Sequence, residues 1–261
     1  MSTTFTAGEE KWRARLGTLR QVVRQELVAR QLTEHVPDRP RRRILDVGCG
    51  QGTQLLRLAQ RGHDLTGLDS SAELLADLER SLSAEPPALR DRVLVVHGDA
   101  LDIAAQFGAG QFDVVLCHGV LMYVEDPAPL LAALAAVTAP GGLVSLLVRN
   151  GDALAMRPAL RGDWAAAADA FGATSYQNRL GIPARADRRA ELIARLRACH
   201  LVVRRWYGVR VFTDQAADDA PVPRAGVLEQ LLACEEQAGR LDPYRSVGAL
   251  LHVIAQRTPP P

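Results

Sequence analysis

Short apolar runs alternate with longer amphipathic segments along this chain of 261 residues. Five runs, at 44–47, 64–69, 93–97, 112–118 and 143–148, are short and bounded by glycine, proline or polar residues, which is typical of buried strands. Helical spacing of apolar residues follows three of them, at 55–59, 72–82 and 127–137. Strands that alternate with helices predict a sheet of mainly parallel strands with helices packed on its faces.

The two ends of the chain extend this pattern. Residues 10–36 are predicted as one amphipathic helix, and 37–43 as a linker. Residues 149–188 lack strand character, so we expect a helical insertion that forms a lid or substrate pocket. The remaining elements are a helix at 189–198, a strand at 201–212, a loop at 213–224, a helix at 226–241 and a strand at 250–255. This pattern predicts an α/β fold, a Rossmann-like doubly wound sheet of seven strands (37–261), preceded by a cap helix (1–36).

A glycine turn connects the first strand to the helix after it. Gly48, Gly50 and Gly52 occupy alternate positions, and Thr53 stands where a dinucleotide fingerprint would have its third glycine. Glycines at such a turn let a ligand approach the backbone closely. Asp46 lies on the ligand side of the turn, where a carboxylate would repel a pyrophosphate but suit an ammonium group. The alternative is an ordinary strand–turn–helix without a ligand.

Polar residues follow the next strands as well. Asp69 ends the second strand, where a carboxylate accepts hydrogen bonds from two ribose hydroxyls. The competing interpretation is that Asp69 or Ser70 caps the following helix. His118 ends a central strand, and we expect it to contact a cofactor or to act as a general base. A partly buried structural histidine is the alternative.

Composition narrows the function classes. The formal net charge is +1, so no global field attracts the protein to nucleic acid or to a membrane. The four cysteines form no C-x-x-C pair and no acidic–histidine cluster is evident, so we expect neither a disulfide framework nor a metal. The chain lacks a signal-peptide core and an apolar run long enough to cross a membrane, so we expect a cytoplasmic protein. The oligomeric state is not readable from these patterns.

The glycine turn resembles motif I of the class I S-adenosylmethionine (SAM)-dependent methyltransferases, here Leu45–Gly52. The Pro-Gly-Gly turn at 140–142 is similar to another motif of that class. The resemblance implies SAM as cofactor, with Asp46 near its methionine end and an antiparallel last strand pair. It also implies that Asp99 accepts from the adenine amino group and that the backbone of Ala100 contacts the ring.

Over nearly its whole length the chain resembles one family, the tRNA 5-carboxymethoxyuridine methyltransferases. The similar stretches are 17–21, 59–63, 118–127, 145–146 with Asn150, 208–214, and 242–244 with Gly248 and 251–253. The resemblance implies methylation of a carboxylate on a wobble uridine, with Arg20 reaching the methionine carboxylate. The other residues that it assigns to SAM are Gly48, Cys49, Gly50, Asp69, Asp99, Ala100 and His118. Two departures lie on the substrate side: the insertion lacks a lysine-rich run, and Arg149 replaces a tyrosine.

Methyl transfer from a sulfonium is an in-line displacement in which positioning supplies much of the catalysis. A carboxylate acceptor is already ionised and needs no base, and Arg149 and Arg210 are the candidates to hold it. Their alternative role is surface salt-bridging. If the acceptor is a hydroxyl, His118 is the first candidate base. A methyltransferase of small metabolites and a non-enzymatic SAM-binding subunit are the competing hypotheses.

Overall fold

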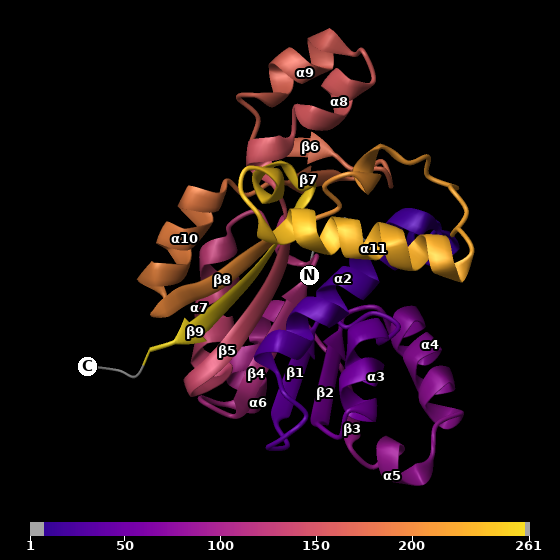
Figure 1. Cartoon of the computed structure of the whole chain (residues 1–261). Coiled ribbons are helices and arrows are strands. Elements are labelled where there is room, and N and C mark those ends of the chain that lie inside the picture. The colour runs from indigo at the N-terminus through magenta and orange to yellow at the C-terminus, as the bar shows by residue number, and fades with distance from the viewer. Residues whose placement is uncertain (1–7, 259–261) are drawn as a thin grey trace.

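The structure, a computed structural model, describes residues 8–258. Its main sheet has seven strands in the order β3-β2-β1-β4-β5-β9-β8 (Figure 1). The strands are β1 (Arg43–Val47), β2 (Asp64–Asp69), β3 (Val93–His97), β4 (Phe112–His118), β5 (Thr138–Arg149), β8 (Leu201–Val209) and β9 (Leu250–Arg257). Strand β9 runs antiparallel to both β5 and β8, and the other neighbours are parallel. The predicted sheet is confirmed.

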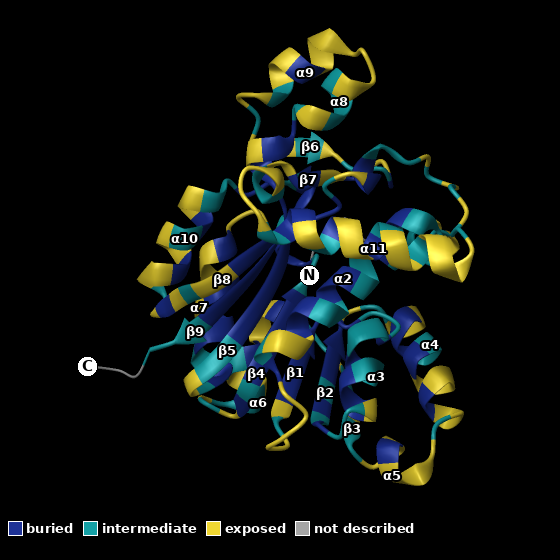
Figure 2. Cartoon of the chain, viewed as in Figure 1, coloured by how far each residue is buried: buried dark blue, intermediate teal, exposed yellow. Residues whose placement is uncertain are grey.

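Helices cover both faces of this sheet. One face carries the later helices: α6 (Ile103–Phe107), α7 (Pro127–Val137) and α10 (Arg189–Ala198). The other carries α2 (Leu19–His35), α3 (Thr53–Gln60), α4 (Ala72–Ser83), the short α5 (Pro87–Arg90) and α11 (Ala225–Arg240). Neighbouring strand residues point to opposite faces, so Ile44 packs with the second group and Leu45 with the first. Strands such as β1, β4 and β9 are therefore largely buried, as Figure 2 shows.

The single helix predicted over 10–36 is wrong. The chain forms α1 (Glu9–Ala14), turns over 15–18, and begins α2 at Leu19. Thr18, the residue before α2, has an extended backbone, with φ −82° and ψ 156°. The first seven residues of the predicted cap and the last three of the predicted domain lie outside the described part of the chain.

The sequence pattern predicted a helical insertion, but the insertion is only partly helical. After α8 (Met156–Leu160) and α9 (Trp164–Ala170) it forms a two-stranded hairpin of β6 (Ser175–Gln177) and β7 (Pro183–Arg185). Helices α8 and α9 project beyond the carboxyl ends of the sheet strands (Figure 1). The hairpin lies between this projection and the sheet, so the insertion stands over the edge where ligands of parallel sheets bind.

The Pro-Gly-Gly turn lies within β5 and not, as expected, before it. Helix α7 ends at Val137, and β5 begins at Thr138 with a register shift opposite Phe112 and Val114. No helix within residues 8–258 is long and apolar enough to span a bilayer.

Candidate active site

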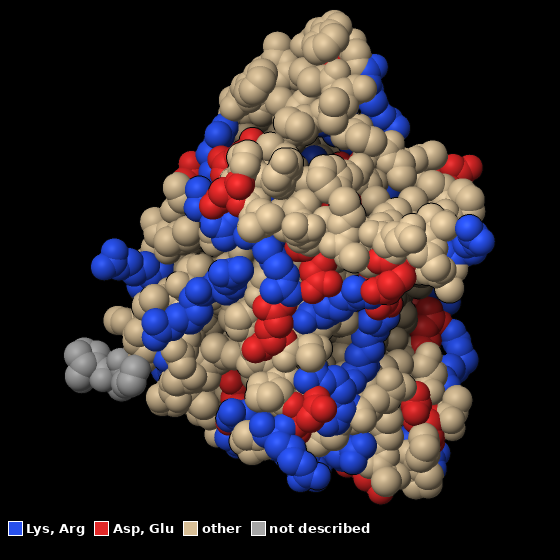
Figure 3. All heavy atoms as spheres, in the orientation of Figure 1, with Lys and Arg blue, Asp and Glu red and all other residues tan. Residues whose placement is uncertain are grey.

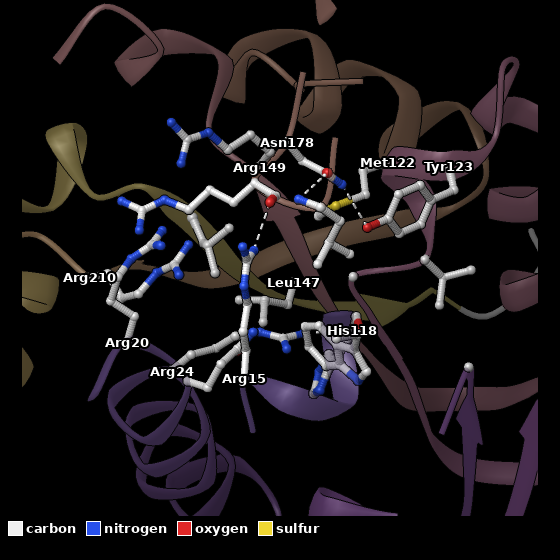
Figure 4. A pocket seen from close by; sticks show the side chains of 18 of the residues that line it. Arg15, Arg20, Arg24, His118, Met122, Tyr123, Leu147, Arg149, Asn178 and Arg210 are labelled. Atoms are coloured by element: carbon white, nitrogen blue, oxygen red, sulfur yellow. Dashed lines mark hydrogen bonds between the residues drawn. The ribbon is translucent and has the colours of Figure 1, made fainter. Parts of the chain in front are cut away.

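A cavity of about 590 Å³ opens at the carboxyl ends of β1, β2, β4 and β5, beneath the insertion (Figure 4). Its volume is in the range of pockets that hold cofactors and small substrates. Nine of the predicted site residues line it: Arg20, Asp46, Gly48, Cys49, Gly50, Asp69, His118, Arg149 and Arg210. Asp99 and Ala100 do not line it. Their roles in adenine binding stay predictions.

The glycine turn has the backbone that only glycine adopts without strain. Gly48 and Gly50 have φ of +70° and +54°, and a Cβ on Gly48 would lie 2.2 Å from a methyl group of Val120. The N–H groups of Gly48 and Cys49 both donate to the carbonyl of Leu68 on β2. The turn is thereby tied to the neighbouring strand, and its tip faces the cavity.

Asp69 lies at the end of β2 beside this turn. Its carboxylate accepts from the N–H of Gly50 at 2.8 Å and from the N–H of Ser71 at 2.9 Å. Burial raises the pKa of Asp69, although these N–H groups oppose the shift. The cap of α4 is Ser71, whose hydroxyl accepts from Leu74, and not Asp69 or Ser70. Asp69 is thus fixed in place while still lining the cavity.

Asp46 is a buried carboxylate without a partner. It is 4% exposed and, within the described part of the chain, forms no hydrogen bond or ion pair. Burial raises the pKa of Asp46 to about 7, and the charge of Asp69 acts in the same direction. Arg24 opposes the shift. A lone buried carboxylate beside a cavity is suited to a cationic ligand group.

His118 ends a chain of buried hydrogen bonds. Its Nε2 lies 2.8 Å from the hydroxyl of Ser145, which lies 2.8 Å from Nε2 of His252. Nδ1 of His252 lies 2.6 Å from the side-chain oxygen of Gln31 and therefore donates to it. Ser145 then donates to His252 and accepts from His118, which leaves Nδ1 of His118 as an acceptor. Burial lowers the pKa of His118 well below its usual value, so the ring is neutral.

Three arginines share one carboxylate on the opposite side of the cavity. The carboxylate of Asp214, which is 5% exposed, accepts from Nη2 of Arg20 at 2.8 Å. Nη2 of Arg210 lies 3.4 Å and Nη1 of Arg149 lies 3.6 Å from its oxygens. Burial alone would raise the pKa of Asp214, but these arginines hold it far below its usual value. The cluster carries a net positive charge that faces the cavity (Figure 4).

Local structure presents this cluster. Strand β8 ends at Val209 because Arg210 adopts a left-handed backbone with φ of 58°, so the strand predicted to 212 is too long. The buried carboxylate of Glu235 accepts from the N–H groups of three consecutive residues, 211–213, and fixes the turn that carries Asp214. Arg149 precedes Asn150, whose amide donates to two carbonyls at 246 and 248. Arg149 and Arg210 are buried and line the cavity, so they are not surface residues.

Sequence reasoning missed several residues that line the cavity. Arg24, which the sequence pattern does not single out, lines the cavity and donates to the carbonyl of His118 at 3.3 Å. The ring of Tyr176, which belongs to the unpredicted hairpin, faces the guanidinium of Arg149. The guanidinium carbon lies 5.1 Å from the centre of that ring. Arg157 of α8 also lines the cavity. No local sequence signal separates a helix arginine that lines a cavity from one on a solvated helix face.

Arg20 occupies a different setting from the predicted one. It lines the cavity, but its guanidinium donates to Asp214 and also, at 3.3 Å, to Asp218. Its contact with a methionine carboxylate stays a prediction. No group of three or more histidine, cysteine or acidic side chains suited to a metal occurs within residues 8–258.

Comparisons with known proteins agree on the kind of enzyme. Residues 45–146 match a family model described as a methyltransferase domain. The chain is 30% identical over 243 residues to tRNA 5-carboxymethoxyuridine methyltransferase of Escherichia coli (strain K12), which covers 92% of this chain and 89% of that protein. It is 41% identical over 109 residues to a ubiquinone biosynthesis O-methyltransferase of Psychrobacter cryohalolentis, which covers 42% and 41% of the two chains.

Among solved structures, the chain is similar to magnesium protoporphyrin IX methyltransferase of Synechocystis with bound SAH, with a TM-score of 0.64. Sequence identity is 16%, and the alignment covers 97% of this chain and 95% of that one. At this identity the likeness concerns the fold alone.

Proposed function

Because the chain belongs to the class I SAM-dependent methyltransferases, in the family of the tRNA 5-carboxymethoxyuridine methyltransferases, we propose that it methylates a carboxylate. The observation that carries the proposal is the cluster of Arg20, Arg149 and Arg210, which share the carboxylate of Asp214 while only Arg20 also contacts Asp218. A buried excess of positive charge is costly unless an anion compensates it. An anionic acceptor would do so.

The cluster has unused hydrogen-bonding capacity as well as charge. The buried Nε–H groups of Arg20, Arg149 and Arg210 have no partner within the described part of the chain. Arg157, at the rim, also has an unpartnered Nε–H, and burial lowers its pKa to about 10. Guanidinium groups bind carboxylates through paired, charge-assisted hydrogen bonds. We assign Arg149 and Arg210 to the acceptor carboxylate.

The donor side uses the glycine turn and the carboxylates around it. SAM, when bound, supplies a methyl group on a positively charged sulfur. We assign Asp46, Gly48, Cys49 and Gly50 to its methionine end, and Asp69 to the ribose hydroxyls. Asp99 and Ala100 are assigned to the adenine and His118 to a neutral contact beside the sulfonium. The unpartnered Asp46 and the open glycine tip fit such a ligand.

The reaction asks the protein for position rather than for a proton acceptor. A lone pair of the acceptor oxygen would form the new C–O bond while the methyl–sulfur bond breaks. The electron pair of the broken bond would stay on sulfur. No proton moves, so no general base is needed. The neutral His118, with its lowered pKa, is a weak base, which favours a carboxylate over a hydroxyl acceptor. Arg149 and Arg210 hold the carboxylate, and the insertion limits access of water.

The acceptor that family membership favours is a carboxymethoxy group on a tRNA wobble uridine, which would place the reaction in the cytoplasm. A small carboxylate metabolite is the second candidate, because the net charge is +1 and the chain has one lysine, Lys11. On the face shown in Figure 3, the projecting tip of α8 and α9 is largely uncharged. On this face, the tip therefore offers few positively charged side chains to neutralise tRNA phosphates.

The test is a methylation assay with labelled SAM on tRNA that bears carboxymethoxyuridine, on unmodified tRNA, and on the free modified nucleoside. A carboxylate product is a methyl ester, which mild alkali hydrolyses, whereas methyl ethers and amines survive. Label on the modified tRNA alone, released by alkali, supports the tRNA acceptor. Label on the free nucleoside favours the metabolite hypothesis, and an alkali-stable product refutes carboxylate methylation.

A further inference from the structure

A row of polar side chains crosses the interior of the sheet behind the cavity. His118 on β4, Leu147 on β5 and His252 on β9 lie opposite one another in register, so their side chains share one face. Ser145 precedes Leu147 by two residues and points to the same face. Helix α2 covers this face and supplies Gln31. Gln31, Ser145 and His252 are at most 1% exposed, so they must satisfy one another's hydrogen bonds.

The hydrogen bonds of this row run in one direction. Burial lowers the pKa of His252 to about 3, so its ring is neutral. Nδ1 of His252 lies 2.6 Å from the side-chain oxygen of Gln31, which can only accept, so Nδ1 carries the proton of that ring. The hydroxyl of Ser145 donates to Nε2 of His252 and accepts from Nε2 of His118. The amide of Gln31 therefore sets which nitrogen of His118 is protonated, three hydrogen bonds away.

We propose that Gln31, Ser145 and His252 are positioning residues that fix His118 as the tautomer with its proton on Nε2. Nδ1 of His118 has no partner within the described part of the chain, and the residue lines the cavity. The nitrogen left for a ligand is therefore an acceptor. The tautomer itself does not depend on the proposed function, but its use does. Beside a sulfonium, a lone pair is favourable and an N–H group is unfavourable.

The surroundings of Gln31 favour the observed direction. The opposite direction would need the amide nitrogen of Gln31 to face His252 and its oxygen to face α11. On that side lies the carbonyl oxygen of Gly208. A Cβ built on Gly239 would lie 2.3 Å from this oxygen and 3.8 Å from the amide nitrogen of Gln31. A carbonyl oxygen on this side suits the amide nitrogen and repels the amide oxygen.

The test is heteronuclear NMR of ligand-free protein labelled at the histidine ring nitrogens, near neutral pH, which separates the two neutral tautomers of each ring. Wild type should carry protons on Nε2 of His118 and on Nδ1 of His252. Gln31→Met would leave Nδ1–H of His252 buried without an acceptor, so both rings should change tautomer. Gln31→Glu is the matched control and should keep the wild-type pattern, because a carboxylate also only accepts.

Ser145→Ala interrupts the row in its middle. It should move the proton of His118 to Nδ1, which can reach the cavity, and leave that of His252 on Nδ1. Ser145→Thr retains the hydroxyl and should restore the wild-type tautomer of His118. His63, whose Nδ1 accepts from the N–H of Arg42 at 3.2 Å, lies outside the row and should not change in any variant. A wild-type His118 protonated on Nδ1, or a tautomer unchanged in both Gln31→Met and Ser145→Ala, would overturn the inference.

Calorimetric titration tests the use of the tautomer. It measures the affinities of SAM and of its demethylated product, which lacks the charge on sulfur, and takes their ratio within each variant so that a general loss of affinity cancels. Gln31→Met should lower the preference for SAM about 2- to 5-fold, the value of a weak hydrogen bond, and Gln31→Glu should keep it. Reversed tautomers with an unchanged preference would overturn the role beside the sulfonium. The predicted tautomers without carboxylate methylation would refute the proposed function and leave the positioning role intact.

Discussion

Asp46→Asn should stabilise the free protein while weakening its binding of SAM. The carboxylate is buried, and no described residue offers it a hydrogen bond or an ion pair. The charged groups around it are Asp69, which repels it, and Arg24, which attracts it without contact. The thiols of Cys49 and Cys117 are also within its field, and burial raises the pKa of each. Asparagine keeps the shape and removes the charge.

The magnitude follows from the pKa of Asp46, which burial raises from 3.8 to about 7. Because the folded protein binds the proton more tightly than the unfolded chain, the stability linked to Asp46 is fully present below pH 3.8 and is lost as pH rises through about 7. A shift of about three units corresponds to about 4 kcal/mol. Asp46→Asn should therefore raise the free energy of unfolding by up to about 4 kcal/mol near pH 8, but only about 2 kcal/mol near pH 5.

The assay is urea denaturation of the ligand-free wild type and variant near pH 5 and pH 8, together with SAM titration near pH 8. The matched control is Asp214→Asn, a second buried aspartate that is surrounded by arginines rather than left alone. Removal of the Asp214 charge should lower the free energy of unfolding. A gain for Asp46→Asn that is the same at both pH values, or a loss near pH 8, would refute the reasoning. An Asp46→Asn variant with unchanged affinity for SAM would also refute the reasoning.

Three further predictions concern the two sides of the cavity. Asp214→Asn should lower the free energy of unfolding by about 3–5 kcal/mol near pH 7, measured by denaturation, because it leaves Arg149 and Arg210 without an acidic partner and Arg20 with Asp218 alone. Arg149→Met should raise KM for the carboxylate acceptor about 10- to 100-fold with the SAM dissociation constant unchanged, as steady-state kinetics and calorimetry would show. Asp69→Ala should weaken SAM binding at least about tenfold, and undiminished affinity would contradict its assignment to the ribose.

The sheet was predictable because its strands are buried on both faces. Runs such as 44–47 and 112–118 are apolar except at Asp46, Asp113 and His118, a pattern typical of a strand between two helix layers. Their ends then place Asp46, Asp69 and His118 at one edge of the sheet, where the structure has them line one cavity. The donor side follows from local pattern and from the topology of a parallel sheet.

The missed elements lack such a pattern. Strands β6 and β7 have three residues each, too few for a period to be visible, and they depend on the turn fixed by Asn178, which bonds backbone N–H groups at 180 and 182. The break before α2 rests on Gly17 and Thr18 alone, inside a stretch whose apolar spacing is otherwise continuous. Neither feature leaves a visible period in the apolar positions.

The acceptor side was predictable only in part. Arg149 and Arg210 were identified as candidates, but the role of Asp214 depends on a turn that Glu235 stabilises from a distant helix. Arg24 is one of several arginines in the N-terminal segment, and only its lack of an acidic partner sets it apart. Charge compensation is a property of the assembled cavity, so no local sequence window contains it.

The two sides of the cavity depart from charge balance in opposite ways. On the donor side, the buried carboxylate of Asp46 has no partner within the described part of the chain, which suits a positively charged ligand group. On the acceptor side, Arg149 and Arg210 share a carboxylate with a third arginine, which leaves positive charge for an anion. Each arrangement costs stability in the free protein and is relieved when its ligand binds. Under the proposed function the donor group is zwitterionic and the acceptor group anionic, so each side would favour its own ligand and disfavour the other's, which would order the two reactants across the cavity.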